Sequence, residues 1–124
     1  MIVLDSSVLI DHLRNDPRAA KALEGRTGAE LPRASLVTKA EILKGMRSHE
    51  RRMIRALFAS IHWVEVDNAT AELAGELARL YRRSHPGVEI PDFIIAATAM
   101  RLDGELWTNN IKHFPMFEDL VSPY

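Results

Sequence analysis

The stretch that decides the fold is residues 1–11, Met1-Ile-Val-Leu-Asp-Ser-Ser-Val-Leu-Ile-Asp11. Residues 2–4 are apolar and rich in β-branched side chains, which is typical of a buried strand in a parallel sheet. Asp5 follows at once, and Ser6 and Ser7 can cap the helix that the next apolar residues predict. This stretch therefore places a carboxylate at the carboxyl end of a central strand, where open α/β sheets bind their ligands.

The rest of the chain alternates short apolar runs with segments that have the apolar spacing of a helix. The runs that predict strands are residues 31–37, 62–66 and 105–108, with a last edge strand at 120–121. The helical segments are residues 18–23, 38–46, 48–61, 69–83 and 91–103, with a helical turn at 111–114 and a loop at 26–30. This alternation predicts an α/β fold, a three-layer α/β/α sandwich with a mainly parallel four- to five-stranded sheet.

The helix ends also carry recognisable signals. Thr38 and Glu41 have the spacing of a capping box, which predicts that a helix begins at Thr38. Asp67 or Asn68 is expected to cap the long helix that follows. Gly104 suits the position just after a helix end, because glycine adopts the left-handed conformation readily.

Length and composition limit the classes of protein. The chain has 124 residues and is expected to form one domain over 1–124. It has no cysteine, which excludes a disulfide scaffold and a thiolate zinc site and fits a cytoplasmic location. We see neither a membrane-spanning stretch nor a signal peptide. The net charge is only −1, but basic residues cluster within 39–55. The members of this cluster are Lys39, Lys44, Arg47, Arg51, Arg52 and Arg55.

Polar side chains stand at four predicted strand-to-helix junctions. Asp5 ends the first strand, and Glu41 lies in the first turn after the second. Asp92 opens a very apolar helix, and Asn110 follows the last strand of the central set. In a parallel sheet these junctions share one edge, so the side chains can converge. Convergent carboxylates repel one another unless a cation joins them, and their oxygens favour Mg²⁺ or Mn²⁺. Such an ion suits phosphodiester hydrolysis.

The residues alone leave structural explanations open. Asp5 can act as a helix cap, Glu41 as a member of the capping box, and Asp92 as a partner of the helix dipole. Asn110 is also an ordinary turn residue. The basic cluster is either a solvated face or a rim that follows phosphates. Ser7 and Thr108 either orient ligands, bind a phosphate or simply cap. The five histidines lack metal-ligand spacing, and we expect most of them on the surface.

Four stretches carry a resemblance to a known family. They are IVLDSSVLI at 2–10, AEILKG at 40–45, PDFIIAATA at 91–99 and TNNIKHF at 108–114. Each is loose alone, but together they stand in family order and span nearly the whole chain. The chain thus resembles PIN-domain ribonucleases, and specifically the VapC toxins of bacterial type II toxin–antitoxin pairs.

The resemblance implies that Asp5, Glu41, Asp92 and Asn110 form the catalytic site. Asp5 and Asp92 would be direct ligands of Mg²⁺ or Mn²⁺, and Glu41 would hold the metal or its water. Family members often have aspartate where this chain has Asn110, which weakens the case for a second metal. The side chains expected to bind substrate are Ser7, Lys44, Arg51, Arg52 and Thr108.

The resemblance also implies a function and partners. The expected activity is endonucleolytic cleavage of structured RNA, such as tRNA or rRNA, which arrests translation. A small antitoxin would wrap the protein, which would also form a homodimer. Met46, Met53 and Leu57 either line the antitoxin surface or belong to the core.

Other functions fit this sequence less well. A processing or repair nuclease of the same fold would need insertions for which this chain has no room. A non-catalytic RNA- or protein-binding module has no need for three converging acids. A receiver domain would require an Asp-Asp pair after Leu4 and an aspartate after Val37, and neither is present. An Asp-x-Asp phosphatase would require an aspartate where Ser7 stands.

Overall fold

The computed structural model describes residues 1–26 and 30–124. In this part of the chain, four strands form one parallel sheet in the order β3-β2-β1-β4. The strands are β1 (Ile2–Leu4), β2 (Arg33–Ser35), β3 (His62–Val64) and β4 (Glu105–Trp107). Because β1 lies between β2 and β4, the residue that follows it leaves from the middle of the sheet.

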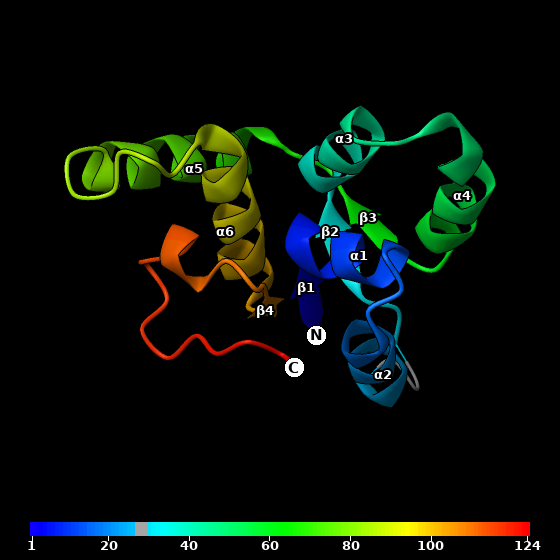
Figure 1. Cartoon of the computed structure of the whole chain (residues 1–124). Helices are drawn as coiled ribbons and strands as arrows, with labels where there is room; N and C mark the ends of the chain where they lie inside the picture. The colour runs from blue at the N-terminus through cyan, green and yellow to red at the C-terminus, as the bar shows by residue number, and fades with distance from the viewer. Residues whose placement is uncertain (27–29) are drawn as a thin grey trace.

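Helices cover both faces of the sheet (Figure 1). The helices are α1 (Ser6–Leu13), α2 (Pro17–Arg26), α3 (Leu36–Lys44), α4 (Arg51–Ala59), α5 (Asn68–Tyr81) and α6 (Ile90–Leu102), with 3₁₀ turns η1 (Ser48–Glu50) and η2 (Ile111–His113). Helices α5 and α6 lie on one side of the sheet, and α1 to α4 lie on the other. The predicted three-layer α/β/α sandwich is therefore confirmed.

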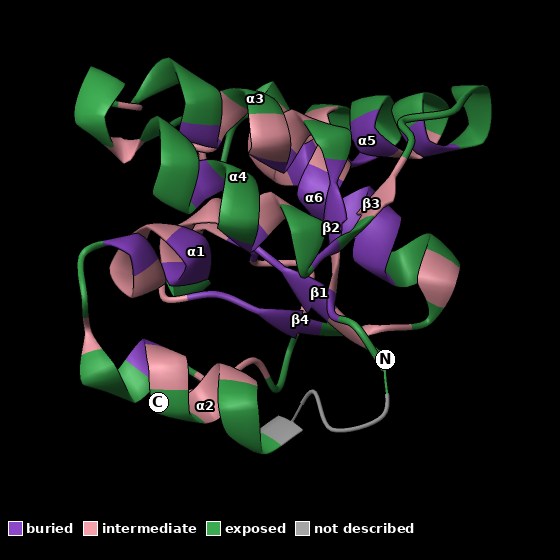
Figure 2. Cartoon of the chain, turned by 90° about the vertical axis from the view of Figure 1, so that its right-hand side faces the viewer, coloured by how far each residue is buried: buried purple, intermediate pink, exposed green. Residues whose placement is uncertain are grey.

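Each face has its own hydrophobic core, and β1 contributes to both. Val3 packs into the core with Phe93 and Leu106, whereas Leu4 packs into the core with Ile54 and Trp107. This follows from the alternation of side chains along a strand. Figure 2 shows β1 as a buried strand inside the molecule. Along the described residues, no helix combines the length and the apolar character needed to cross a bilayer.

The junction between β2 and α3 differs from the prediction. The strand ends at Ser35, and Leu36 already begins the helix. Ser35 is the cap, because its Oγ accepts a hydrogen bond from the backbone N–H of Val37 at 3.2 Å. The capping box predicted from Thr38 and Glu41 is therefore wrong. The predicted strand at 31–37 was too long because Leu36 and Val37 are apolar whether they extend a strand or begin a helix.

Three other expectations need correction. Asp103, rather than Gly104, takes the left-handed conformation after α6, with φ 51°. Residues 120–121 form no strand, since Leu120 packs against the α5–α6 core instead of pairing with the sheet. Asp5, rather than Ser6 or Ser7, occupies the cap position of α1. Of the loop predicted at 26–30, residues 27–29 lie outside the described residues.

Gly104 lies where α6 returns to the sheet, and we expect Gly104→Ala to destabilise the protein. An added Cβ would stand 2.9 Å from Val3 Cγ2 and 3.5 Å from the carbonyl oxygen of Met1. Val3 is fully buried, so it has little room to move. The expected loss is about 1–3 kcal/mol, measured by urea unfolding. Gly75→Ala in α5 is the control, because its Cβ would meet nothing within 4 Å. An equal effect of both changes would contradict this explanation.

Candidate active site

Asp5 is held rigidly at the end of β1. It is 1% exposed, and its backbone N–H donates to the carbonyl of Trp107 at 2.9 Å. Its Oδ2 accepts hydrogen bonds from Ser7 Oγ at 2.8 Å and from Thr108 Oγ1 at 2.7 Å. Two hydroxyls, one from α1 and one from the end of β4, thus fix one oxygen of this carboxylate. Thr108 is fully buried, so its hydroxyl orients Asp5 instead of binding a phosphate.

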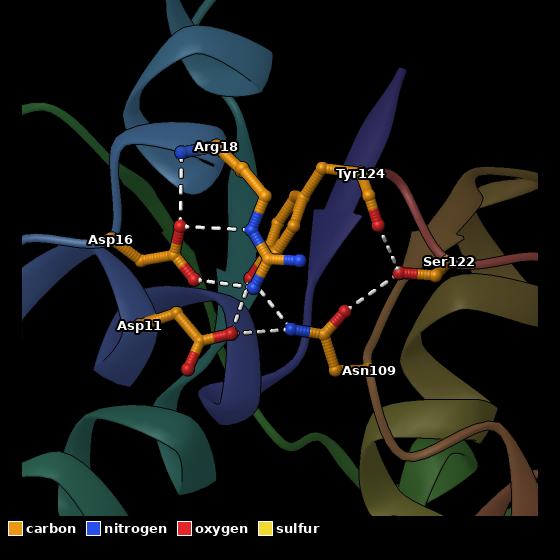
Figure 3. A network of polar contacts seen from close by, with 6 residues as sticks. All are labelled: Asp11, Asp16, Arg18, Asn109, Ser122 and Tyr124. Atoms are coloured by element: carbon orange, nitrogen blue, oxygen red, sulfur yellow. Dashed lines mark hydrogen bonds and ion pairs between the residues drawn. The ribbon is translucent and has the colours of Figure 1, made fainter.

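A polar network anchors the segment next to this pair of hydroxyls (Figure 3). The backbone N–H of Asn109 donates to Ser7 Oγ at 3.0 Å, and the Asn109 amide donates to Asp11 Oδ2 and to the Tyr124 hydroxyl. Tyr124 in turn donates to Asp11 Oδ2 at 2.6 Å. Burial, together with the Asp11 carboxylate, raises the pKa of the Tyr124 phenol, which therefore stays protonated as a donor. The network holds the residues after β4 against α1.

Glu41 projects from the second turn of α3 and has an unsatisfied oxygen. Its Oε1 is buried and has no hydrogen-bond partner among the residues that the structure describes. Burial is the largest cause that raises the pKa of Glu41, followed by the negative charges of Asp5 and Asp92. Hydrogen bonding to Ser6 and the charge of Lys44 act in the opposite direction. A side chain that binds a cation has a buried oxygen of this kind, near other acids and without a hydrogen-bond partner, when the cation is absent.

Asp92 lies in the first turn of α6 and is half-buried. Burial raises its pKa, the charge of Asp5 adds to this rise, and the nearby His113 opposes it. Because Asp5 raises the pKa of both Glu41 and Asp92, the three carboxylates share one electrostatic environment. The structure therefore places three of the four predicted catalytic residues in one region: Asp5 directly after β1, Glu41 on α3 and Asp92 on α6.

His113 is a member of this site that the sequence analysis missed. Its Nδ1 lies 3.2 Å from Asp92 Oδ2, and its side chain is 44% exposed. The lack of metal-ligand spacing predicts a surface position for most of the histidines. Its position in the sequence could have identified it as part of the site, because His113 lies on η2, shortly after the strand end that is followed by Thr108.

The other predicted residues are on the surface. Asn110 is exposed, and its backbone N–H donates to Thr108 Oγ1 at 2.9 Å. Lys44, Arg51 and Arg52 are exposed on α3 and α4. Within the described part of the chain, none of these three side chains forms a hydrogen bond or ion pair with the three acids, although the charge of Lys44 lowers the pKa of Glu41.

The three acids fit a divalent cation by their chemistry. In residues 1–26 and 30–124, no three His, Asp or Glu side chains already lie close enough to enclose an ion. The donors are nevertheless all carboxylate oxygens, and that of Glu41 is buried without a partner. Hard oxygen donors of this kind favour Mg²⁺ or Mn²⁺ over zinc.

The raised pKa of Glu41 leads to a prediction about stability and pH. A raised pKa means that the folded state binds this proton more tightly than the unfolded chain does. The free energy of unfolding therefore falls as pH rises from the ordinary value of 4.5 through the folded-state pKa. We expect Glu41→Gln to raise the melting temperature in EDTA by a few degrees at pH 7.5, with the gain vanishing near pH 4. A melting temperature that is lower at pH 7.5, or a gain that is the same at both pH values, would contradict this account.

Known proteins are similar to this chain in sequence, and solved structures are similar to it in fold. The PIN domain family profile matches residues 2–115. Ribonuclease VapC19 of Mycobacterium tuberculosis is 41% identical over 126 residues, covering 100% of this chain and 100% of that protein. Ribonuclease VapC10 of the same organism is 42% identical over 124 residues, covering 100% of this chain and 93% of that protein.

Solved structures give the same picture. A toxin–antitoxin complex from Klebsiella pneumoniae contains a chain with a TM-score of 0.84 and 28% sequence identity, covering 100% of this chain and 98% of that one. The structure of VapBC-1 from nontypeable Haemophilus influenzae gives a TM-score of 0.73 at 27% identity, covering 92% of this chain and 90% of that one.

Proposed function

The chain belongs to the PIN-domain family, and on that premise we propose that it is an endoribonuclease of the VapC type, the toxin of a type II toxin–antitoxin pair. One structural observation supports this proposal above the others. Three carboxylates from β1, α3 and α6 lie in one electrostatic environment at the carboxyl edge of the sheet. Burial and the negative charge of Asp5 raise the pKa values of Glu41 and Asp92, and a bound cation would offset this cost of keeping the carboxylates ionised.

We propose that Asp5, Asp92 and Glu41 hold Mg²⁺ or Mn²⁺. Such an ion supplies charge stabilisation at a phosphate and lowers the pKa of a bound water. Ser7 and Thr108 occupy Asp5 Oδ2, so Oδ1 is the oxygen that remains for the ion. His113 holds Asp92 through Oδ2 in the same way. These contacts orient both carboxylates before the substrate arrives, as side chains behind a metal site commonly do.

The proposed substrate is structured RNA such as tRNA or rRNA, cleaved internally in the cytoplasm so that translation stops. The experiment is incubation of the purified protein with total cellular RNA in Mg²⁺, Mn²⁺ or EDTA, followed by mapping of the fragment ends. We expect discrete fragments in the metal-containing samples alone. A folded sample that leaves all RNA intact with either metal would favour the alternative function, a non-catalytic binding module.

A small antitoxin protein is the proposed partner, because similar solved structures are toxin–antitoxin complexes. Next to Glu41, a hollow of about 400 Å³ lies between α1, α3 and α4, with Ile10, Met46 and Arg47 among its walls. An antitoxin seated there would reach the acidic site. Of the apolar residues expected either on the antitoxin surface or in the core, Leu57 is buried in the core, whereas Met53 is 43% exposed. We also propose that the protein forms a homodimer.

A further inference from the structure

A second basic surface lies at the end of α5, apart from the cluster at 39–55. Arg79, Arg82 and Arg83 are exposed there and surround a hollow of about 420 Å³, which Glu76 and Leu80 complete. We call these three arginines the α5 arginine cluster. Arg79 lies in the last turn of α5, Arg82 is its C-cap, and Arg83 follows in the turn, so the three side chains border one hollow.

The charges of this cluster are not held in ion pairs. Arg18 pairs with Asp16 and Arg101 pairs with Asp67, whereas the basic residues at 39–55 resemble the α5 arginine cluster in forming no ion pair among the described residues. Among the described residues, no member of the α5 arginine cluster makes an ion pair, although Glu76 lines the same hollow. Three adjacent guanidinium groups repel one another, and an external anion would relieve that repulsion.

The chain connection between α5 and α6 determines where this cluster lies relative to the acidic site. Asp67 caps the start of α5, and Arg101 stands in the last turn of α6, with Nη1 and Oδ1 2.8 Å apart. Helices α5 and α6 also pack against each other. Residues 82–89 join the end of α5 to the start of α6, which carries Asp92, so the cluster lies on the α6 side of the acidic site. In both views, α5 and the chain that joins it to α6 lie at the same edge of the molecule as α3 (Figures 1 and 2).

We propose that the α5 arginine cluster binds the phosphate backbone of the RNA substrate on the α6 side of the acidic site. This inference rests on the proposed function and adds a substrate-binding surface to it. Asp5, Glu41 and Asp92 repel a polyanion, so attraction must come from basic groups outside the site. Arginine suits this role because its planar fork donates two parallel hydrogen bonds to a phosphate.

The test measures the salt dependence of RNA binding. The intact protein is titrated against fluorescein-labelled bulk tRNA in EDTA, with anisotropy recorded over a range of salt concentrations. The variant is Arg82→Gln with Arg83→Gln. The matched control, Arg18→Gln with Lys21→Gln, removes the same charge from α2, which lies at the opposite edge of the molecule (Figures 1 and 2).

We expect the α5 variant to lower the slope of log K against log salt by about 0.7–0.9 for each lost phosphate contact. Affinity at low salt should fall on the order of 10-fold, while the control stays near wild type. Arg82→Lys with Arg83→Lys keeps both charges and should keep most of the slope. Circular dichroism shows whether each variant is folded. We expect the α5 variant to keep the wild-type spectrum and to show the lower salt slope.

Two outcomes would overturn this inference. The first is an α5 variant whose salt slope equals that of the wild type. The second is an equal loss of affinity and slope in the α5 variant and the α2 control, which would mean that net charge alone determines RNA binding. The proposed function fails separately. A protein that binds tRNA through the cluster but never cleaves RNA would keep this surface and lose the nuclease. A protein that cleaves RNA with an unchanged slope would keep the nuclease and lose this surface.

Discussion

Asp5→Asn is expected to reduce RNA cleavage on the order of 10³-fold or more, because the site loses one of the charges that would hold the metal. The fold should persist. Asparagine has the shape of aspartate, and its Oδ1 can accept the hydrogen bonds that Ser7 and Thr108 now donate to Asp5 Oδ2. Asparagine is therefore a better test than alanine, which would remove the oxygen to which both the Ser7 and the Thr108 hydroxyl now donate. The measurement is the initial rate of cleavage of one mapped RNA target in Mn²⁺.

The matched control for this change is Asp16→Asn. Asp16 pairs with Arg18 at the start of α2 and has no part in the acidic site. It should retain wild-type cleavage, and both variants should melt close to the wild type in EDTA. Undiminished cleavage by a folded Asp5→Asn protein would remove Asp5 from the mechanism.

Phe93→Ala is expected to cause the largest loss of stability, about 3–5 kcal/mol. Phe93 is 2% exposed and packs in the core between α6 and the sheet. Alanine would leave a cavity there, directly after Asp92 in the chain. A loss of this size is a large part of the roughly 5–15 kcal/mol that holds a domain folded. Urea unfolding at pH 7 measures it.

Leu80→Ala is the control for the core substitution. Leu80 is 70% exposed, although it lies on α5, the helix that packs against α6. Its removal should change stability by no more than about 0.5 kcal/mol. A loss below 1 kcal/mol for Phe93→Ala would mean that the core closes around the cavity.

The sequence predicted the centre of the fold better than its boundaries. Residues 2–4 are all apolar and a polar residue follows at once, so both β1 and the position of Asp5 could be predicted from them. The start of α3 did not follow. Ser35 and Thr38 are both good caps, and only the extended backbone of Ser35 decides between them. Likewise, Leu120 is apolar because it packs on a core, which a single sequence cannot distinguish from strand pairing.

The positions of the acids were predictable from the sequence, and Ser7 and Thr108 were among the side chains considered for orienting ligands, but the role of His113 beside Asp92 was not predicted. Asp5, Glu41 and Asp92 follow from strand-to-helix junctions, which topology alone brings to one edge. The contact between His113 and Asp92 and the hydrogen bond from Thr108 to Asp5 join segments far apart in the chain. The sequence predicts repulsion among the converging acids. In the structure, burial raises the pKa values of Glu41 and Asp92 more than that repulsion does.

Mn²⁺ binding, measured by titration calorimetry on wild type, Asp5→Asn, Asp92→Asn and the control Asp16→Asn, tests directly whether the converging acids form a metal site. We expect the wild type and the control to bind alike, and each of the two site variants to bind at least about 10-fold more weakly. Wild-type protein that binds no Mn²⁺, or site variants that bind it as tightly as the control, would contradict the assignment of Asp5, Glu41 and Asp92 as a metal site.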